Sequence, residues 1–245
     1  MDQNSIKTIL MARVNILCTK RIKPLLAGKA AVQGIRIKVV EFIRIHLLIS
    51  EETAEAFKKT GPEAVYVFTS ANSVDALYKL VNTYQLNINK QAIIYATEGR
   101  TAAMVKQLFP QFQIAGTAPT ASELAGKIIG NKEKKLTFFC GNIRRQELPA
   151  KLKEKGIGLN EIQVYRTELT PVKVDEKFDG VLFFSPSAVS SFFEKNKLSA
   201  GVTCFAVGET TAEALREYTN NKIIVARQPL QEQVIDLIID HYKRK

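Results

Sequence analysis

Short apolar runs alternate with segments of helical period along most of the chain. Most of these runs are four to seven residues long, which suits buried strands, and each is followed by a turn and then by an amphipathic stretch. Strands are predicted at 14–19, 64–69, 92–96, 114–116, 136–140, 162–165, 180–184, 202–207 and 223–226. Strands that alternate with helices in this way are typical of an α/β fold with parallel sheets.

One apolar stretch is much longer than the others. Residues 35–49 are almost continuously apolar, with charged residues interleaved through the first ten. We interpret this stretch as one long strand with one solvent-exposed face, of the kind that runs between two domains.

Helix starts are predicted beside this stretch and elsewhere from capping signals. Pro24 suits a first helical turn, and Ser50 and Ser122 suit N-caps.

Residues 136–167 contain a complete βαβ unit. A strand over 136–140 ends at Gly141 and Asn142, a helix follows from about 144 to 155, and a second strand ends at Tyr165. The turn at Gly141 would leave free backbone N–H groups at the carboxyl end of a strand, where α/β sheets bind their ligands. The unit therefore predicts an accessible, ligand-binding turn at one end and a terminal tyrosine, Tyr165, at the other.

The chain also contains an internal repeat. Residues 65–80 match 181–196 in strand, hydroxyl-bearing turn and helix, and 93–108 match 203–218 in the same way. Two matched halves suggest two similar domains with a ligand in the cleft between them.

Small hydroxyl residues precede the helices of both halves at matched positions. They are Ser70, Ser73 and Thr101 in one half and Ser185, Ser187, Thr210 and Thr211 in the other. Such residues beside helix N-termini can bind carboxylate or phosphate, but they also cap helices where no ligand exists. Both interpretations stay open for each residue taken alone.

The net charge of the chain indicates which kinds of ligand it attracts. The 245-residue chain has a net charge of +11, with nine basic residues (Lys7, Arg13, Lys20, Arg21, Lys23, Lys29, Arg36, Lys38 and Arg44) before residue 49. This surface attracts anions, either nucleic-acid phosphates or the carboxylates of a small ligand, or it is a solvated basic face without a ligand.

Several site types are missing from the sequence. There is no P-loop, no nucleophile elbow and no dinucleotide-binding glycine motif. The cysteines Cys18, Cys140 and Cys204 lie at the ends of apolar runs and predict buried, reduced thiols without a zinc site. The two histidines, His46 and His241, fit neither an acid–base catalyst nor a metal ligand.

A set of motifs spread over most of the chain resembles one enzyme family. FTSANSV, FFCGNIRRQELPAKLKEKGI followed by VYRT, FFSPSAV and AVGETTAEAL occur in the order and spacing of uroporphyrinogen-III synthases. The resemblance implies two flavodoxin-like α/β domains, each a parallel sheet with helices on both faces, joined by a two-stranded β connection with a cleft between them. The first domain would comprise residues 1–43 and 168–245, and the second, inserted domain residues 46–165.

The resemblance also implies a function. The family cyclises hydroxymethylbilane, a linear tetrapyrrole with eight carboxylates, to uroporphyrinogen III with inversion of ring D and loss of water, in haem biosynthesis. It is a carbon–oxygen lyase that uses neither cofactor nor metal. Tyr165 matches the family's proposed catalytic tyrosine. The residues implied to bind substrate are Thr19, Lys20, Ser70, Thr101, Gly141, Asn142, Ser185, Ser187, Thr210 and Thr211.

We accordingly expect a monomeric cytoplasmic enzyme that binds neither nucleic acid nor membrane. No apolar run reaches the length of a membrane span, and the N-terminus lacks a signal-peptide pattern. The alternative hypothesis is a non-catalytic two-domain protein that binds an anionic ligand. A nucleic-acid-binding protein is a third.

Overall fold

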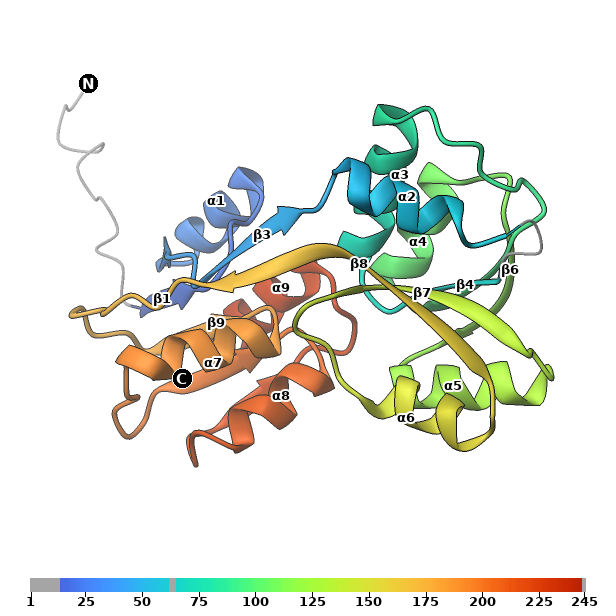
Figure 1. Ribbon diagram of the computed structural model, residues 1–245. Coiled ribbons are helices and arrows are strands. Elements are labelled where there is room, and N and C mark those ends of the chain that lie inside the picture. Colours follow the sequence, from blue (N-terminus) through green and yellow to red (C-terminus); the bar gives the residue numbers. More distant parts are fainter. Residues whose placement is uncertain (1–13, 62–64, 244–245) are drawn as a thin grey trace, which may run out of the picture. The chain divides into compact units, whose positions relative to one another are not determined.

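The chain folds into two compact α/β units (Figure 1). The computed structural model describes residues 14–61 and 65–243, so Lys7, Arg13 and Ala64, used above, lie outside the described residues. Unit 1 contains the described residues of Met1–Arg44 and Leu169–Lys245, and unit 2 is Ile45–Glu168. The predicted α/β class with mostly parallel sheets is confirmed.

Unit 1 is built on a five-stranded parallel sheet in the order β11-β10-β9-β1-β2. Taken by their order along the chain, these strands run 2-1-3-4-5, the flavodoxin order, which reverses between β1 and β9. Its elements are β1 (Val14–Cys18), α1 (Pro24–Val32), β2 (Ile35–Val39), β9 (Gly180–Phe183), α7 (Pro186–Lys195), β10 (Thr203–Ala206), α8 (Glu209–Arg216), β11 (Ile223–Val225) and α9 (Gln231–Lys243).

Helices cover both faces of the unit 1 sheet. Successive side chains of a strand point to opposite faces, so Ile16 packs with α1 and α9 while Leu17 packs with α7 and α8. Both side chains are almost fully buried. The central strands β9 and β10 are buried along their whole length, which is why they appear in the sequence as continuous runs instead of alternating ones.

Unit 2 contains a six-stranded sheet in the order β3-β8-β7-β4-β5-β6. Each pairing among strands β4 to β8 is parallel, and the order reverses between β4 and β7. The elements are β3 (Ile43–Leu47), α2 (Glu51–Lys58), β4 (Val65–Phe68), α3 (Ala71–Thr83), β5 (Ile93–Thr97), α4 (Arg100–Leu108), β6 (Gln113–Ala118), α5 (Ala121–Gly130), β7 (Lys135–Gly141), α6 (Glu147–Glu154) and β8 (Gly158–Leu169).

The unit 2 sheet is also covered on both faces. Helices α2, α3 and α4 pack on the face that carries Tyr66 and Phe68. Helices α5 and α6 pack on the face that carries Val65 and Val67. Strand β8 is the longest in either sheet, and the chain passes between the units within β3 and β8.

Three predicted elements differ from the structure. The single strand over 35–49 is wrong, because Phe42 turns into the unit 1 core, where its ring centroid lies 5.3 Å from that of Phe192. This turn separates β2 from β3. Thr120, not Ser122, caps α5, since its hydroxyl accepts the N–H of Glu123. The last strand of the βαβ unit extends well beyond 162–165 at both ends.

Other sequence signals were correct. Pro24 begins α1, and the Ser50 hydroxyl caps α2 by accepting the N–H of Thr53. Among the described helices, not one combines the length and the apolar character needed to cross a membrane.

Candidate functional site

The predicted site residues of unit 2 lie at one edge of its sheet. Ser70 follows β4, Thr101 lies in the first turn of the helix after β5, and Gly141 ends β7 with Asn142 directly after it. These parallel strands and β8, which carries Tyr165, are consecutive in the sheet, so their carboxyl ends are adjacent. This edge also contains the reversal of strand order between β4 and β7, the position where open α/β sheets bind ligands.

The predicted residues of unit 1 occupy the corresponding edge of their own sheet. Thr19 and Lys20 follow β1, and Ser185 and Ser187 lie at the start of α7 after β9. The Thr210 and Thr211 pair lies in the first turn of α8 after β10. The three strands are neighbours in the order β10-β9-β1, so these residues also lie beside a strand-order reversal.

A β-bulge directs Tyr165 into the protein. Cys140 pairs with Gln163 and Gly141 pairs with Tyr165, so Val164 is an extra residue in β8. Ile162 and the bulge residue Val164 are buried, and beyond the bulge Tyr165 and Thr167 are buried. Because side chains alternate along a strand, a regular β8 would turn Tyr165 outward.

The Tyr165 ring lies directly over the backbone of Gly141. A Cβ atom at Gly141 would be 2.5 Å from the ring Cζ and 2.9 Å from the phenol oxygen. The phenol reaches Ser70, beyond the end of β4. A side chain from β8 therefore crosses the end of β7 to the point where the strand order reverses, and only a glycine at 141 permits this.

The environment of Tyr165 favours the protonated phenol. Tyr165 is 7% exposed, and burial raises its pKa above the ordinary value of 10.0, although Ser70 lowers the pKa in part. A phenol that stays protonated at neutral pH can donate a hydrogen bond or a proton. The arrangement can assist the departure of an oxygen leaving group.

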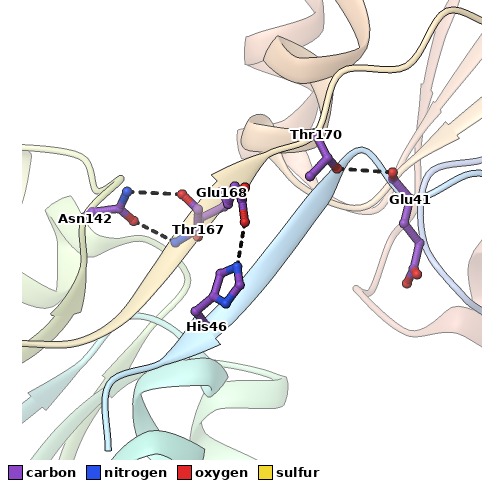
Figure 2. A network of polar contacts seen from close by, with 6 residues as sticks. All are labelled: Glu41, His46, Asn142, Thr167, Glu168 and Thr170. Atoms are coloured by element: carbon purple, nitrogen blue, oxygen red, sulfur yellow. Dashed lines mark hydrogen bonds and ion pairs between the residues drawn. The ribbon is translucent and has the colours of Figure 1, made fainter. Parts of the chain in front are cut away.

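Asn142 is bonded to β8. Its side-chain nitrogen donates to the Thr167 carbonyl at 3.1 Å, and its side-chain oxygen accepts the Thr167 N–H at 2.7 Å (Figure 2). The amide group thus pairs with the β8 backbone two residues beyond Tyr165. The sequence assigned Asn142 to substrate binding and missed its bonds to Thr167.

The hydroxyl residues divide into partly exposed and buried groups. Ser70 and Ser185 cap α3 and α7 by accepting backbone N–H groups at 3.2 Å, while Ser187 and Thr210 lie partly exposed in first turns. Capping and ligand binding are compatible, since a hydroxyl that accepts an N–H still has its own hydrogen to donate. The buried residues are Thr19, Ser73, Thr101 and Thr211.

Thr19 joins two strands of unit 1. Its hydroxyl donates to the Leu182 carbonyl at 3.0 Å and accepts the Phe184 N–H at 3.4 Å, and its side chain is 2% exposed. These bonds cross the strand-order reversal between β1 and β9. A structural role for Thr19 follows from this geometry.

Replacing Thr19 with valine is expected to destabilise unit 1 by about 1–2 kcal/mol, because the substitution keeps the shape but leaves the partly buried N–H of Phe184 without this acceptor. Urea denaturation measures the change, with Thr83→Val, at an exposed position of α3, as the matched control. Equal stability of the two variants would contradict a structural role for the Thr19 hydroxyl.

The cysteines and histidines do not provide a nucleophile or a metal site. All three cysteines are free and buried, as predicted, and burial raises the pKa of the Cys140 thiol to about 11. His46 Nε2 lies 2.6 Å from a Glu168 carboxylate oxygen on the adjacent strand (Figure 2). Among the described residues, no group of three or more His, Cys, Asp or Glu side chains could hold a metal ion.

Both basic and acidic side chains lie near the carboxyl ends of the strands in each unit. Arg144 and Arg145 follow Gly141 and Asn142, and Lys20 is exposed after β1. Glu209, which lies between Gly208 and the threonine pair, forms an ion pair of 2.7 Å with Arg216. The ion pair partly offsets a carboxylate that would otherwise repel an anionic ligand beside α8.

Comparison with known proteins identifies the family. Residues 49–236, more than half of the chain, match the family model described as uroporphyrinogen-III synthase HemD. Over 210 residues the chain is 24% identical to uroporphyrinogen-III synthase from Saccharomyces cerevisiae. This alignment covers 73% of this chain and 76% of the yeast protein.

Solved structures agree in fold. A mutant uroporphyrinogen III synthase from the extremely thermophilic bacterium Thermus thermophilus matches with a TM-score of 0.74 and 17% identity, covering 94% of this chain and 98% of that one. Uroporphyrinogen-III synthetase from Helicobacter pylori matches with a TM-score of 0.63 and 18% identity, covering 93% and 99%. The resemblance seen in the sequence motifs is confirmed: this chain belongs to the uroporphyrinogen-III synthase family.

Proposed function

We propose that this protein cyclises hydroxymethylbilane to uroporphyrinogen III, with inversion of ring D and loss of water. Membership of the family gives the reaction class. The observation that carries the proposal within this chain is the buried phenol of Tyr165, which lies over Gly141 at the strand-order reversal of unit 2.

In the proposed mechanism, Tyr165 donates a hydrogen bond to the hydroxyl of the substrate's hydroxymethyl group. As the C–O bond breaks, the phenol proton moves along this hydrogen bond to the departing oxygen, which leaves as water and leaves Tyr165 as a phenolate. The resulting azafulvene cation is attacked by the substituted carbon of ring D, which forms a spiro intermediate that reopens and recloses with ring D inverted. The proton that the pyrrole loses at the final closure balances the one donated at the start.

The phenol's chemical contribution is limited by its acidity. Since its pKa lies above 10.0, Tyr165 is a weak acid and stabilises the departing hydroxyl mainly as a hydrogen-bond donor. Most of the catalysis is positioning: the enzyme holds a reactive chain so that the substituted carbon is the one attacked. Unassisted closure gives the uninverted isomer.

The substrate's eight carboxylates require donors, and the two sheet edges supply them. Four helices, α3, α4, α7 and α8, begin directly after strands, and their first-turn N–H groups and partial positive charge favour carboxylates. We propose that Ser70, Ser187, Thr210 and Lys20 contribute side-chain donors there. The buried Thr19, Thr101 and Thr211 shape these turns instead of contacting the substrate.

We also propose that the protein acts as a monomer in the cytoplasm and binds a small polycarboxylate, not nucleic acid. Three buried free cysteines are consistent with a reducing compartment. The division between the first domain, residues 1–43 and 168–245, and the inserted domain, residues 46–165, stays part of this proposal, as does a substrate cleft.

A coupled assay tests the proposed function. Hydroxymethylbilane is generated enzymatically, this protein is added, the products are oxidised, and the type I and type III isomers are separated chromatographically. We expect the type III isomer to dominate when the protein is in excess. Type I product alone under those conditions would exclude the enzyme and favour a non-catalytic binding protein.

A further inference from the structure

The backbone pairing of strand β8 with β7 ends at Tyr165, the proposed catalytic residue. The β7–β8 ladder ends with the pair Gly141 and Tyr165, and it does so just after the bulge at Val164. A bulge interrupts the ladder and leaves one residue unpaired, so the strand needs fixed points on both sides to keep its register. Before the bulge, the backbone pairing of β8 with β7 provides this fixed point.

The Asn142 side chain provides the fixed point after the bulge. It donates to the Thr167 carbonyl and accepts the Thr167 N–H, the two bonds that the main chain of a neighbouring strand would make (Figure 2). The ladder is thereby extended two residues beyond its last backbone pair. The chain just after β3 holds the opposite side of β8, where the Leu48 N–H donates to the Val164 carbonyl at 2.8 Å.

Tyr165 is therefore held from both directions. The Val164 carbonyl before it is bonded to Leu48, and the Thr167 backbone after it is bonded to Asn142. Loss of the Asn142 bonds would free β8 to relax the bulge. Because relaxation by one residue reverses which side chains point inward, Tyr165 would leave its place over Gly141.

The amide of Asn142 is poorly suited to a carboxylate ligand. Its side-chain oxygen is an acceptor already bonded to an N–H, and one of its two side-chain N–H groups is bonded to a carbonyl. A single N–H remains for a ligand. The bonds of this side chain are directed to the backbone of β8.

We propose that Asn142 is a positioning residue that acts through Tyr165 and not a substrate contact. The proposal rests on the proposed catalytic role of Tyr165. It replaces the assignment of Asn142 to substrate binding that the sequence motif implies. It also assigns a specific role to the turn after β7, which fixes the direction of a side chain on the neighbouring strand.

A double-mutant cycle tests this role, with wild type, Asn142→Ala, Tyr165→Phe and the double variant assayed for type III product. We expect Asn142→Ala to lower kcat about tenfold with KM nearly unchanged, since small misplacements of a reacting group reduce rate strongly. In the Tyr165→Phe background, Asn142→Ala should cause no further loss. Gln163→Ala, at an exposed position of the same strand, is the matched control and should keep full activity.

A second measurement reports the position of Tyr165 without activity. Tetranitromethane nitrates accessible phenols, and trypsin releases Tyr165 as the only tyrosine of peptide 156–166. We expect Tyr165 to be protected in wild type and to be nitrated several times faster in Asn142→Ala. Tyr218, 46% exposed, is the internal reference and should react equally in both proteins.

The outcomes separate the hypotheses. A raised KM with unchanged kcat in Asn142→Ala would make Asn142 a substrate contact and overturn the proposal. Equal losses in both backgrounds would also overturn it, as would unchanged nitration of Tyr165. If wild type forms no type III product, the proposed function fails, whereas the nitration result still decides whether Asn142 positions Tyr165. Asn142→Asp, which keeps the acceptor for the Thr167 N–H but loses the donor, should fall between wild type and Asn142→Ala.

Discussion

Alanine in place of Gly141 is expected to lower kcat for type III product about 100-fold. The added Cβ would lie 2.5 Å from Cζ and 2.6 Å from Cε2 of Tyr165, whereas carbon atoms in contact prefer about 3.5–4.0 Å. Tyr165 is buried, so its ring can yield only by leaving its place above β7.

Gly141→Ala should also destabilise unit 2 by about 1–3 kcal/mol, the usual cost of an oversized side chain in a packed interior. Backbone strain is not the cause, because Gly141 is not among the glycines with positive φ. Gly126→Ala is the matched control: it lies in α5 with open space around its Cα and should be neutral or slightly stabilising.

Steady-state kinetics and urea denaturation of both variants provide the comparison. Wild-type kcat in Gly141→Ala would refute the view that the phenol must lie over residue 141. Loss of activity in Gly126→Ala would show that alanine affects the enzyme by some route other than contact with Tyr165.

Phenylalanine in place of Tyr165 is expected to lower kcat about 100-fold while KM changes little. General acids contribute about 10²–10⁴-fold, and a donor whose pKa lies above 10.0 belongs at the lower end. The substitution keeps the ring over Gly141 and removes only the hydroxyl. A slower enzyme also competes less well with spontaneous closure, so the fraction of type I product should rise as the protein is diluted.

Tyr66→Phe is the appropriate control for this variant. Tyr66 is 1% exposed and belongs to the same buried cluster as Tyr165, so its substitution also removes a buried hydroxyl. Tyr66→Phe should retain wild-type kcat. Single-turnover assays with protein in excess separate the chemical step from product release. An unchanged single-turnover rate in Tyr165→Phe would reduce the phenol to a packing role.

The sequence predicted most of the fold because its signals were local. Buried strands such as Val65–Phe68 appear as continuous apolar runs, and caps such as Ser50 lie beside the helices they begin. The prediction was wrong at Phe42. Its apolar side chain continued the strand pattern of 35–49, but only the folded core of unit 1 determines that it turns inward.

The candidate site was predicted less completely for a related reason. Motifs gave Tyr165 and Gly141, but the contact between them depends on the bulge that shifts the register of β8 against β7. The pairing of Asn142 with Thr167 has no local signature either, because an asparagine after a glycine equally suits a turn. The three buried threonines, among them Thr19, fitted the pattern of ligand-binding hydroxyls, and their burial emerges only from packing.

The bulge at Val164 limits how the length of this strand can vary. A substitution along β8 changes one side chain. Insertion or deletion of one residue between Ile162 and Thr167 instead reverses which side chains beyond it point into the protein and which point outward. Deletion of one residue just before Tyr165, for example, would place Arg166 where Tyr165 now lies. Over evolutionary time, this segment is therefore free to diverge in composition while its residue count stays constant, and an alignment gap within it would indicate a protein that has lost the inward phenol.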